Sequence, residues 1–159
     1  MRIGVPTEVK AYENRIAMVP GGVHALVQDG HDVFVQQGGG LGSGITDEEF
    51  VAAGATIVPD VDELCSMYDM IVKVKEPLPD EIVRCRDGLT IFTYFHFAAA
   101  QELTDAMVSS GAACFTYETL EVGKTLPLLV PMSEVAGRMA IQVGAHCLEK
   151  AQGGRGVLM

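Results

Sequence analysis

The chain has 159 residues, of which 48% are hydrophobic and 20% are charged, and its formal net charge is -10 at pH 7. This length predicts one domain with a full core, and the apolar content excludes a largely disordered chain. The negative charge argues against nucleic acid and against an anionic membrane surface as partners, because both attract clustered Lys and Arg.

No apolar run approaches the roughly 20 residues that are needed to cross a bilayer, and the first residues lack the layout of a signal peptide. We therefore expect a soluble, cytoplasmic protein. The cysteines are Cys65, Cys85, Cys114 and Cys147. They lie far apart and form no Cys-x-x-Cys pair, so we expect free, mostly buried thiols and no metal site.

Strand-like and helix-like segments alternate through the first part of the chain. The expected strands cover residues 2–6, 32–36, 55–58, 70–74, 89–94 and 113–118. The expected helices include one around 23–27 closed by Gly30, one from Thr46 to Gly54, one over 61–68 and one over 101–110. Thr46 with Glu49 three residues later predicts a capping box. This alternation predicts an α/β fold with a mostly parallel sheet flanked by helices.

After Pro131 the pattern becomes one long helix over residues 133–150, with Ser133 as its expected N-cap. Val135, Met139, Val143 and Cys147 recur every four residues along it. Ala136, Ala140 and Gly144 supply a flat, small-residue face. Such a face lets another helix approach closely, so we expect a homo-oligomer through this helix. The sequence thus divides into an α/β domain at 1–131 and a connecting helix at 132–159.

A glycine-rich loop at 38–44 is the feature that most resembles a dinucleotide fingerprint. It fails the Gly-x-Gly-x-x-Gly spacing, because counting from Gly38 puts Ser43 at the third position and counting from Gly40 puts Ile45 there. A flexible turn is therefore favoured over a phosphate loop. The fold is expected to be Rossmann-like without that fingerprint.

Polar residues stand at the carboxyl ends of two neighbouring predicted strands. Lys75 ends Met70-Ile-Val-Lys-Val-Lys75, and His96 ends Thr93-Tyr-Phe-His96. Ligands of α/β sheets sit at that edge. Lysine offers a cation for a carboxylate, and histidine exchanges a proton near pH 7. The pair predicts a site for a small organic acid that undergoes proton transfer.

Each candidate also has a purely structural interpretation. Arg15 is either a planar fork for a carboxylate or a surface arginine. Lys75 alone is equally well a solvated strand end that pairs with Glu76, and a histidine beside Phe95 and Phe97 is more often a packed residue than a catalyst. Together, the two cations and the proton carrier favour a carboxylate-substrate site. The sequence alone does not place Arg15 near the other two residues.

Several segments also resemble a known family. They are Arg2-Ile-Gly-Val-Pro-Thr-Glu8, Glu13-Asn-Arg15-Ile-Ala, Lys73-Val-Lys75-Glu-Pro-Leu-Pro, Phe92-Thr-Tyr-Phe-His96, Tyr117-Glu-Thr and Pro131-Met-Ser-Glu-Val-Ala-Gly-Arg-Met. In these segments, which run in order over essentially the whole chain, the sequence resembles the N-terminal part of bacterial alanine dehydrogenase. The related proton-translocating transhydrogenase shares the opening and a similar lysine strand, but not a histidine placed like His96.

The resemblance implies NAD-dependent oxidative deamination of L-alanine to pyruvate and ammonium, and the reverse amination. It implies that Arg15 and Lys75 hold the substrate carboxylate and carbonyl oxygen, and that His96 is the acid/base. Met132 would face the nicotinamide end of the substrate cleft, and Ser133 would touch NAD.

In that family the NAD-binding domain follows the region that this chain covers. The resemblance therefore implies the N-terminal, substrate-binding part of a truncated enzyme, and we expect no turnover from the chain alone. Two alternatives stay open: a transhydrogenase-like subunit, and a non-catalytic binding or assembly module left by truncation.

Overall fold

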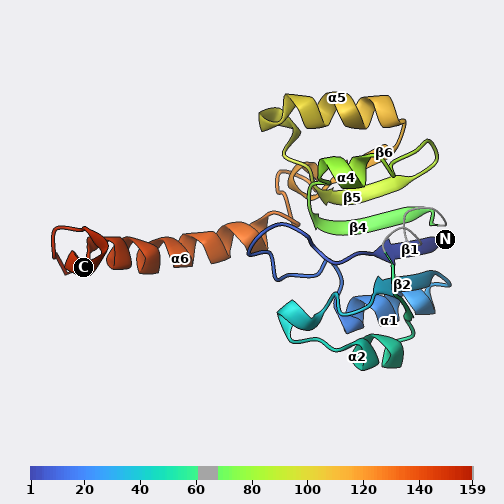
Figure 1. Cartoon of the computed structure of the whole chain (residues 1–159), viewed down its shortest axis with the longest axis horizontal. Helices are drawn as coiled ribbons and strands as arrows, with labels where there is room; N and C mark the ends of the chain where they lie inside the picture. Colours follow the sequence, from blue (N-terminus) through green and yellow to red (C-terminus); the bar gives the residue numbers. More distant parts are fainter. Residues whose placement is uncertain (61–67, 159) are drawn as a thin grey trace. The chain divides into compact units, whose positions relative to one another are not determined.

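The computed structural model describes residues 1–60 and 68–158, and its first part contains a parallel sheet (Figure 1). The strands are β1 (Arg2–Val5), β2 (Asp32–Gln36), β3 (Thr56–Val58), β4 (Met70–Lys75), β5 (Thr90–Tyr94) and β6 (Ala113–Thr116). They lie in the order β3-β2-β1-β4-β5-β6, and each neighbouring pair is parallel. The predicted α/β fold is confirmed. Because the chain runs outward from β1 and then returns to its other side, the topological switch point lies between β1 and β4.

Helices cover both faces of the sheet. They are α1 (Pro20–Gln28), α2 (Asp47–Ala52), α4 (Pro79–Ile82) and α5 (Gln101–Ser110). Residues in parallel register point to the same face, and successive residues point to opposite faces. Val5 and Val35 pack in one cluster with Val23 of α1 and Phe50 of α2. Ile71 and Ile91 alternate with them and pack in the other cluster, with Ile82 of α4 and Met107 of α5. The two halves of the chain thus cover opposite faces.

Most of the local signals in the sequence are confirmed. Thr46 and Glu49 form the predicted capping box at the start of α2. Gly111 ends α5 with a φ of 72°, a left-handed value that glycine adopts at low cost. The last strand ends two residues earlier than predicted, because Tyr117–Thr119 form a 3-10 turn. The short helix α4, which begins at Pro79, was not predicted. The helix predicted over 61–68 lies, except for Tyr68, outside the described residues.

The chain divides into two compact units, Met1–Thr116 and Tyr117–Met159. The second unit contains α6 (Val130–Leu148). The prediction that Ser133 caps this helix is wrong, because its N–H already donates to the Leu129 carbonyl at 3.0 Å within the first turn. The helix starts at Val130 with Pro131 in its first turn, where a missing N–H has no helical partner to lose. The predicted functional division at 131/132 stays a prediction.

Two further expectations concern burial and the membrane. Cys85 and Cys114 are half-buried and Cys147 is exposed. The expectation of mostly buried thiols is therefore wrong for these three residues; Cys147 is exposed because α6 has no buried side chains. Within residues 1–60 and 68–158, no helix is both long and apolar enough to cross a membrane.

Candidate functional site

Three loops meet the carboxyl edge of the sheet beside the topological switch point. The loop after β1 carries Glu8 and Arg15, β4 ends at Lys75, and the chain after β5 begins with Phe95 and His96. The Thr7 N–H donates to the Gln36 side chain at the end of β2 at 2.9 Å, which ties the first loop to the sheet. The predicted site residues of the first unit thus come from three strand ends on one edge.

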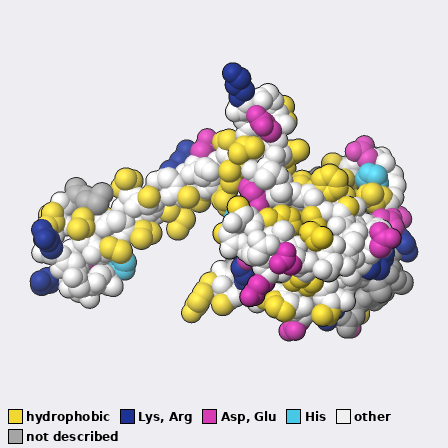
Figure 2. Space-filling view, turned by 90° about the horizontal axis from the view of Figure 1, so that it is seen from above, with side chains coloured by type: hydrophobic (Ala, Val, Ile, Leu, Met, Phe, Trp, Pro, Cys, Tyr) yellow, Lys and Arg dark blue, Asp and Glu magenta, His cyan; other side chains and the backbone are white. Residues whose placement is uncertain are grey.

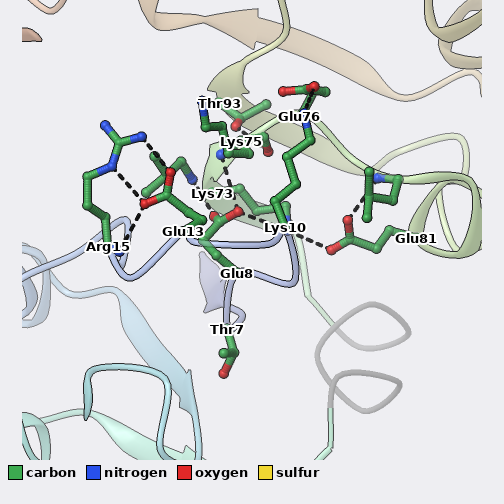
Figure 3. A network of polar contacts seen from close by, with 12 residues as sticks. Thr7, Glu8, Lys10, Glu13, Arg15, Lys73, Lys75, Glu76, Glu81 and Thr93 are labelled. Carbon is green, nitrogen blue, oxygen red and sulfur yellow. Dashed lines mark hydrogen bonds and ion pairs between the residues drawn. The ribbon is translucent and has the colours of Figure 1, made fainter. Parts of the chain in front are cut away.

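Arg15 forms an ion pair with the carboxylate of Glu13 in the same loop. Its Nε donates to Oε1 of Glu13 at 2.8 Å and its Nη2 donates to Oε2 at 2.6 Å, a bidentate pair (Figure 3). The Arg15 guanidinium, with a smaller contribution from the Lys75 charge, lowers the pKa of the Glu13 carboxyl to about 2. Both predicted carboxylate-binding cations therefore act on the same carboxylate. Arg15 acts on this carboxylate by direct contact, and Lys75 acts on it through its charge.

Glu76 does not take the partner that the structural interpretation of Lys75 gave it. Glu76 pairs with the Lys10 ammonium from the first loop. Burial acts to raise the pKa of the Glu76 carboxyl, but the hydrogen bond and charge of Lys10 outweigh it and lower that pKa; the charge of His96 adds to the lowering. His96 therefore lies within electrostatic reach of the end of β4.

His96 departs from the packed-residue interpretation. It is exposed, whereas its neighbour Phe95 is fully buried and stacks on Phe97 with ring centroids 4.4 Å apart. Its φ of 55° is left-handed, which is uncommon for a residue other than glycine. Its ring stacks against Tyr94 at 6.1 Å. A strained backbone that turns a histidine out at a ligand-binding edge supports a functional hypothesis.

A buried charge cluster lies beneath these residues and was not predicted. Lys73 Nζ lies 2.6 Å from Glu81 Oε1 and 3.6 Å from Glu8 Oε2, and the Lys73 and Glu8 side chains are only 4% and 2% exposed. Burial raises the pKa of Glu8, although the Lys73 charge opposes it. A lysine between apolar residues of a central strand was the signal in the sequence, because a buried lysine needs an anionic partner.

The described residues do not form a dinucleotide site at the switch point. Such a site uses a glycine-rich turn after the first strand, whereas this turn reads Pro6-Thr7-Glu8 and carries a buried acid. In the loop at 38–44, a Cβ on Gly40 would lie 2.7 Å from both the Ile45 carbonyl and the Phe50 ring. That glycine is needed for packing rather than for a phosphate. Among the described residues, no three His, Cys, Asp or Glu side chains are grouped to hold a metal ion.

Met132 and Ser133 lie in the first turn of α6, in the second unit. Their contacts with substrate and NAD stay predictions. A hollow of about 620 Å³ between α4 and α5 is lined mainly by apolar residues, with Glu76 at its edge. Arg15, Lys75 and His96 are not among its lining residues. We therefore locate the candidate site at the three loops rather than in this hollow.

Comparison with known proteins agrees with this arrangement. Residues 4–136 match the family described as alanine dehydrogenase/PNT, N-terminal domain. The chain belongs to this family. Alanine dehydrogenase of Bacillus subtilis is 53% identical over 159 residues, which are 100% of this chain but 42% of that protein. The alanine dehydrogenase/PNT N-terminal domain described here thus spans about two fifths of the length of the curated relatives it matches.

Two solved structures, an L-alanine dehydrogenase and a transhydrogenase, resemble this chain to different degrees. An L-alanine dehydrogenase superposes with a TM-score of 0.91 at 47% identity, covering 99% of this chain and 44% of that one. A transhydrogenase from Sinorhizobium meliloti reaches a TM-score of 0.71 at 30% identity, covering 76% of this chain and 36% of that one. This N-terminal domain is therefore more similar to the alanine dehydrogenase in both sequence and structure.

Proposed function

We propose that this chain is the substrate-binding part of an NAD-dependent L-alanine dehydrogenase. The observation that carries the proposal is the bidentate contact of Arg15 with the Glu13 carboxylate, on which the charge of Lys75 also acts. Two cations from different strand ends that already act on one carboxylate form a site suited to the carboxylate of a small acid. The identity to proteins named alanine dehydrogenase supports alanine and pyruvate as that acid.

In this proposal the chain's own residues bind, orient and exchange protons. The substrate carboxylate replaces that of Glu13 on the Arg15 fork, and the Lys75 ammonium reaches the substrate carboxylate and the carbonyl oxygen. His96, exposed at the neighbouring strand end, gives and takes the proton that iminium hydrolysis requires near neutral pH. Fixing the carboxylate at two points orients the reacting carbon toward the open side of the site.

Binding of NAD belongs, in this proposal, to the part of the longer relatives outside the matched region. The turn after β1 at the switch point does not fit a dinucleotide, so we assign no step of hydride transfer to the residues there. Met132 and Ser133 are proposed to contact the substrate and the cofactor, respectively, on the resemblance alone. We accordingly expect the 159-residue chain to show no turnover by itself.

We also propose that the protein is cytoplasmic and self-associates through the helix at 133–150. Figure 2 shows apolar side chains following one another along α6. Three of them recur every four residues on one side of the helix and are about half exposed: Val135 57%, Met139 52% and Val143 52%. Exposed apolar surface of this kind marks an interface, and a second copy with the same face would cover it.

An assay of NADH oxidation tests the proposed activity. A protein that contains this sequence and has the length of the relatives should oxidise NADH only when pyruvate and ammonium are both present. The 159-residue chain should not. Hydride exchange between two nicotinamide nucleotides without pyruvate would instead establish the transhydrogenase-like alternative. Turnover that survives purification and scales with the isolated chain would overturn the assignment of NAD binding to other residues.

A further inference from the structure

Lys75 occupies a place where the regular strand ladder fails. The pairing of β4 with β5 is regular from Met70 to Val72, and it then shifts register before Lys75 meets Tyr94. Backbone groups in such an irregularity lose their ladder partners, and buried polar groups need others. The position of the Lys75 side chain therefore depends on whatever holds the backbone there.

Glu8 binds two backbone N–H groups at this irregularity. Its carboxylate accepts a hydrogen bond from the Val74 N–H at 2.6 Å and one from the Lys75 N–H at 3.3 Å (Figure 3). Its side chain is 2% exposed, and Lys73 Nζ lies 3.6 Å from its Oε2. A buried carboxylate held by a cation and two N–H groups has little freedom to move, so it fixes the backbone that it binds.

Thr93 supplies a third partner, from the neighbouring strand. Its hydroxyl donates to the Lys75 carbonyl at 2.9 Å, and the residue is fully buried near the end of β5. The N–H and the carbonyl of Lys75 are thus both bound by side chains. Both of these side chains lie in segments that also carry site residues: Glu8 begins the loop to Arg15, and Thr93 precedes His96 by three residues.

We propose that Glu8 and Thr93 are positioning residues that hold Lys75 in the geometry for binding a 2-oxo acid. Glu8 also ties the loop that carries Arg15 to the end of β4, so one carboxylate sets the two cations relative to each other. The ligand in this statement rests on the proposed function. The hydrogen bonds of Glu8 and Thr93 to the backbone of Val74 and Lys75, which we call the backbone clamp, do not depend on the ligand. The clamp and the binding of the ligand are therefore measured separately.

The clamp is tested by NMR on the labelled chain. In Glu8→Gln, one of the two N–H groups loses its acceptor, and at least one of the Val74 and Lys75 amides should exchange with solvent at least about tenfold faster than in the wild type. In Thr93→Val, which keeps the shape and removes the donor, the Lys75 carbonyl resonance should shift. Thr93→Ser keeps the hydroxyl and should stay near wild type. Glu48→Gln and Thr90→Val are the matched controls.

The functional arm is pyruvate titration of the same samples. If the wild type binds, Glu8→Gln and Thr93→Val should bind several-fold more weakly, and Thr93→Ser should retain binding. Equal affinity of all variants would overturn the positioning role, and unchanged amide exchange and carbonyl resonance would overturn the clamp. If the wild type does not bind pyruvate, the proposed function fails. The rates of amide exchange at Val74 and Lys75 still show whether the clamp exists. If Glu8→Gln does not fold, the comparison of Thr93→Val with Thr93→Ser tests both the clamp and the positioning role.

Discussion

Replacing Lys73 with methionine should destabilise the protein strongly, in a way that depends on pH. Lys73 is 4% exposed and lies between two carboxylates, Glu8 at 2% and Glu81 at 14% exposure. Removing one partner of a buried ion pair typically costs about 3–5 kcal/mol, because the remaining charge is left unpaired in a poorly solvated site. Glu8 keeps its two backbone hydrogen bonds, so we expect about 3 kcal/mol at pH 8.

The pH dependence follows from the carboxyl of Glu8. Burial already raises its pKa above the usual value, so the folded state keeps this proton to higher pH than the unfolded chain, and stability falls as pH rises through that interval. Lys73 opposes the rise, so Lys73→Met should raise the pKa of Glu8 further and extend the interval upward. One carboxyl changes the free energy of unfolding by at most about 1.4 kcal/mol per pH unit.

The assay is urea unfolding followed by circular dichroism at pH 5, 6, 7 and 8, with Lys124→Met as the control. Lys124 is exposed in the second unit, and its replacement should change the free energy of unfolding by less than about 0.5 kcal/mol. The deficit of Lys73→Met should be smallest at pH 5 and grow toward pH 8. A deficit under about 1 kcal/mol at pH 8, or one that does not grow with pH, would refute the reasoning about the buried cluster.

Four further results are expected. Thr46→Ala removes the N-cap of α2 and should cost about 1 kcal/mol in urea unfolding. Glu13→Gln should remove stability that the wild type has above the usual carboxyl pKa and loses as pH falls toward about 2; acid titration of both proteins measures it. In a full-length enzyme with these residues, His96→Ala should lower kcat roughly 100- to 10,000-fold with little change in pyruvate binding, whereas Lys75→Ala should damage both in steady-state amination kinetics. Sedimentation of the unmodified chain at micromolar concentration should show self-association through α6.

Each of these has an outcome that contradicts it. Thr46→Ser keeps the capping oxygen and should unfold like the wild type. If Thr46→Ala is as stable as the wild type, the Thr46 cap does not stabilise the protein. If the free energy of unfolding depends on pH in the same way in Glu13→Gln and in the wild type, the ion pair between Arg15 and Glu13 adds no stability. Near-normal turnover of His96→Ala across pH 6–10 would make the histidine structural. A clean monomer would exclude α6 as an interface between copies.

The sequence predicted the fold well, because its local signals and its global pattern agree. The apolar runs, the Thr46 capping box and Gly111 each specify an element through nearby residues, and the alternation of those elements specifies a parallel sheet. The start of α6 was misplaced because Pro131 was treated as a boundary, although proline is compatible with the first turn of a helix.

The candidate site was predicted only in part. Lys75 and His96 stand at strand ends, so periodicity alone indicates their edge of the sheet. The proximity of Arg15 to Lys75 depends on how the first loop folds, which no local pattern encodes. Glu8 was missed for the same reason: its partners Val74 and Lys75 are 66 and 67 residues away in the chain. Long-range pairs of this kind come from the topology rather than from spacing.

Pyruvate titration of the 159-residue chain, observed by NMR, tests the central claim most directly. Saturable binding should shift the resonances of Arg15 and Lys75, and Lys75→Ala should bind at least about tenfold more weakly because a charge-assisted contact to the carboxylate is lost. Lys124→Ala should bind like the wild type. Absence of saturable binding, or equal affinity of Lys75→Ala and wild type, would contradict a 2-oxo acid site at this edge of the sheet.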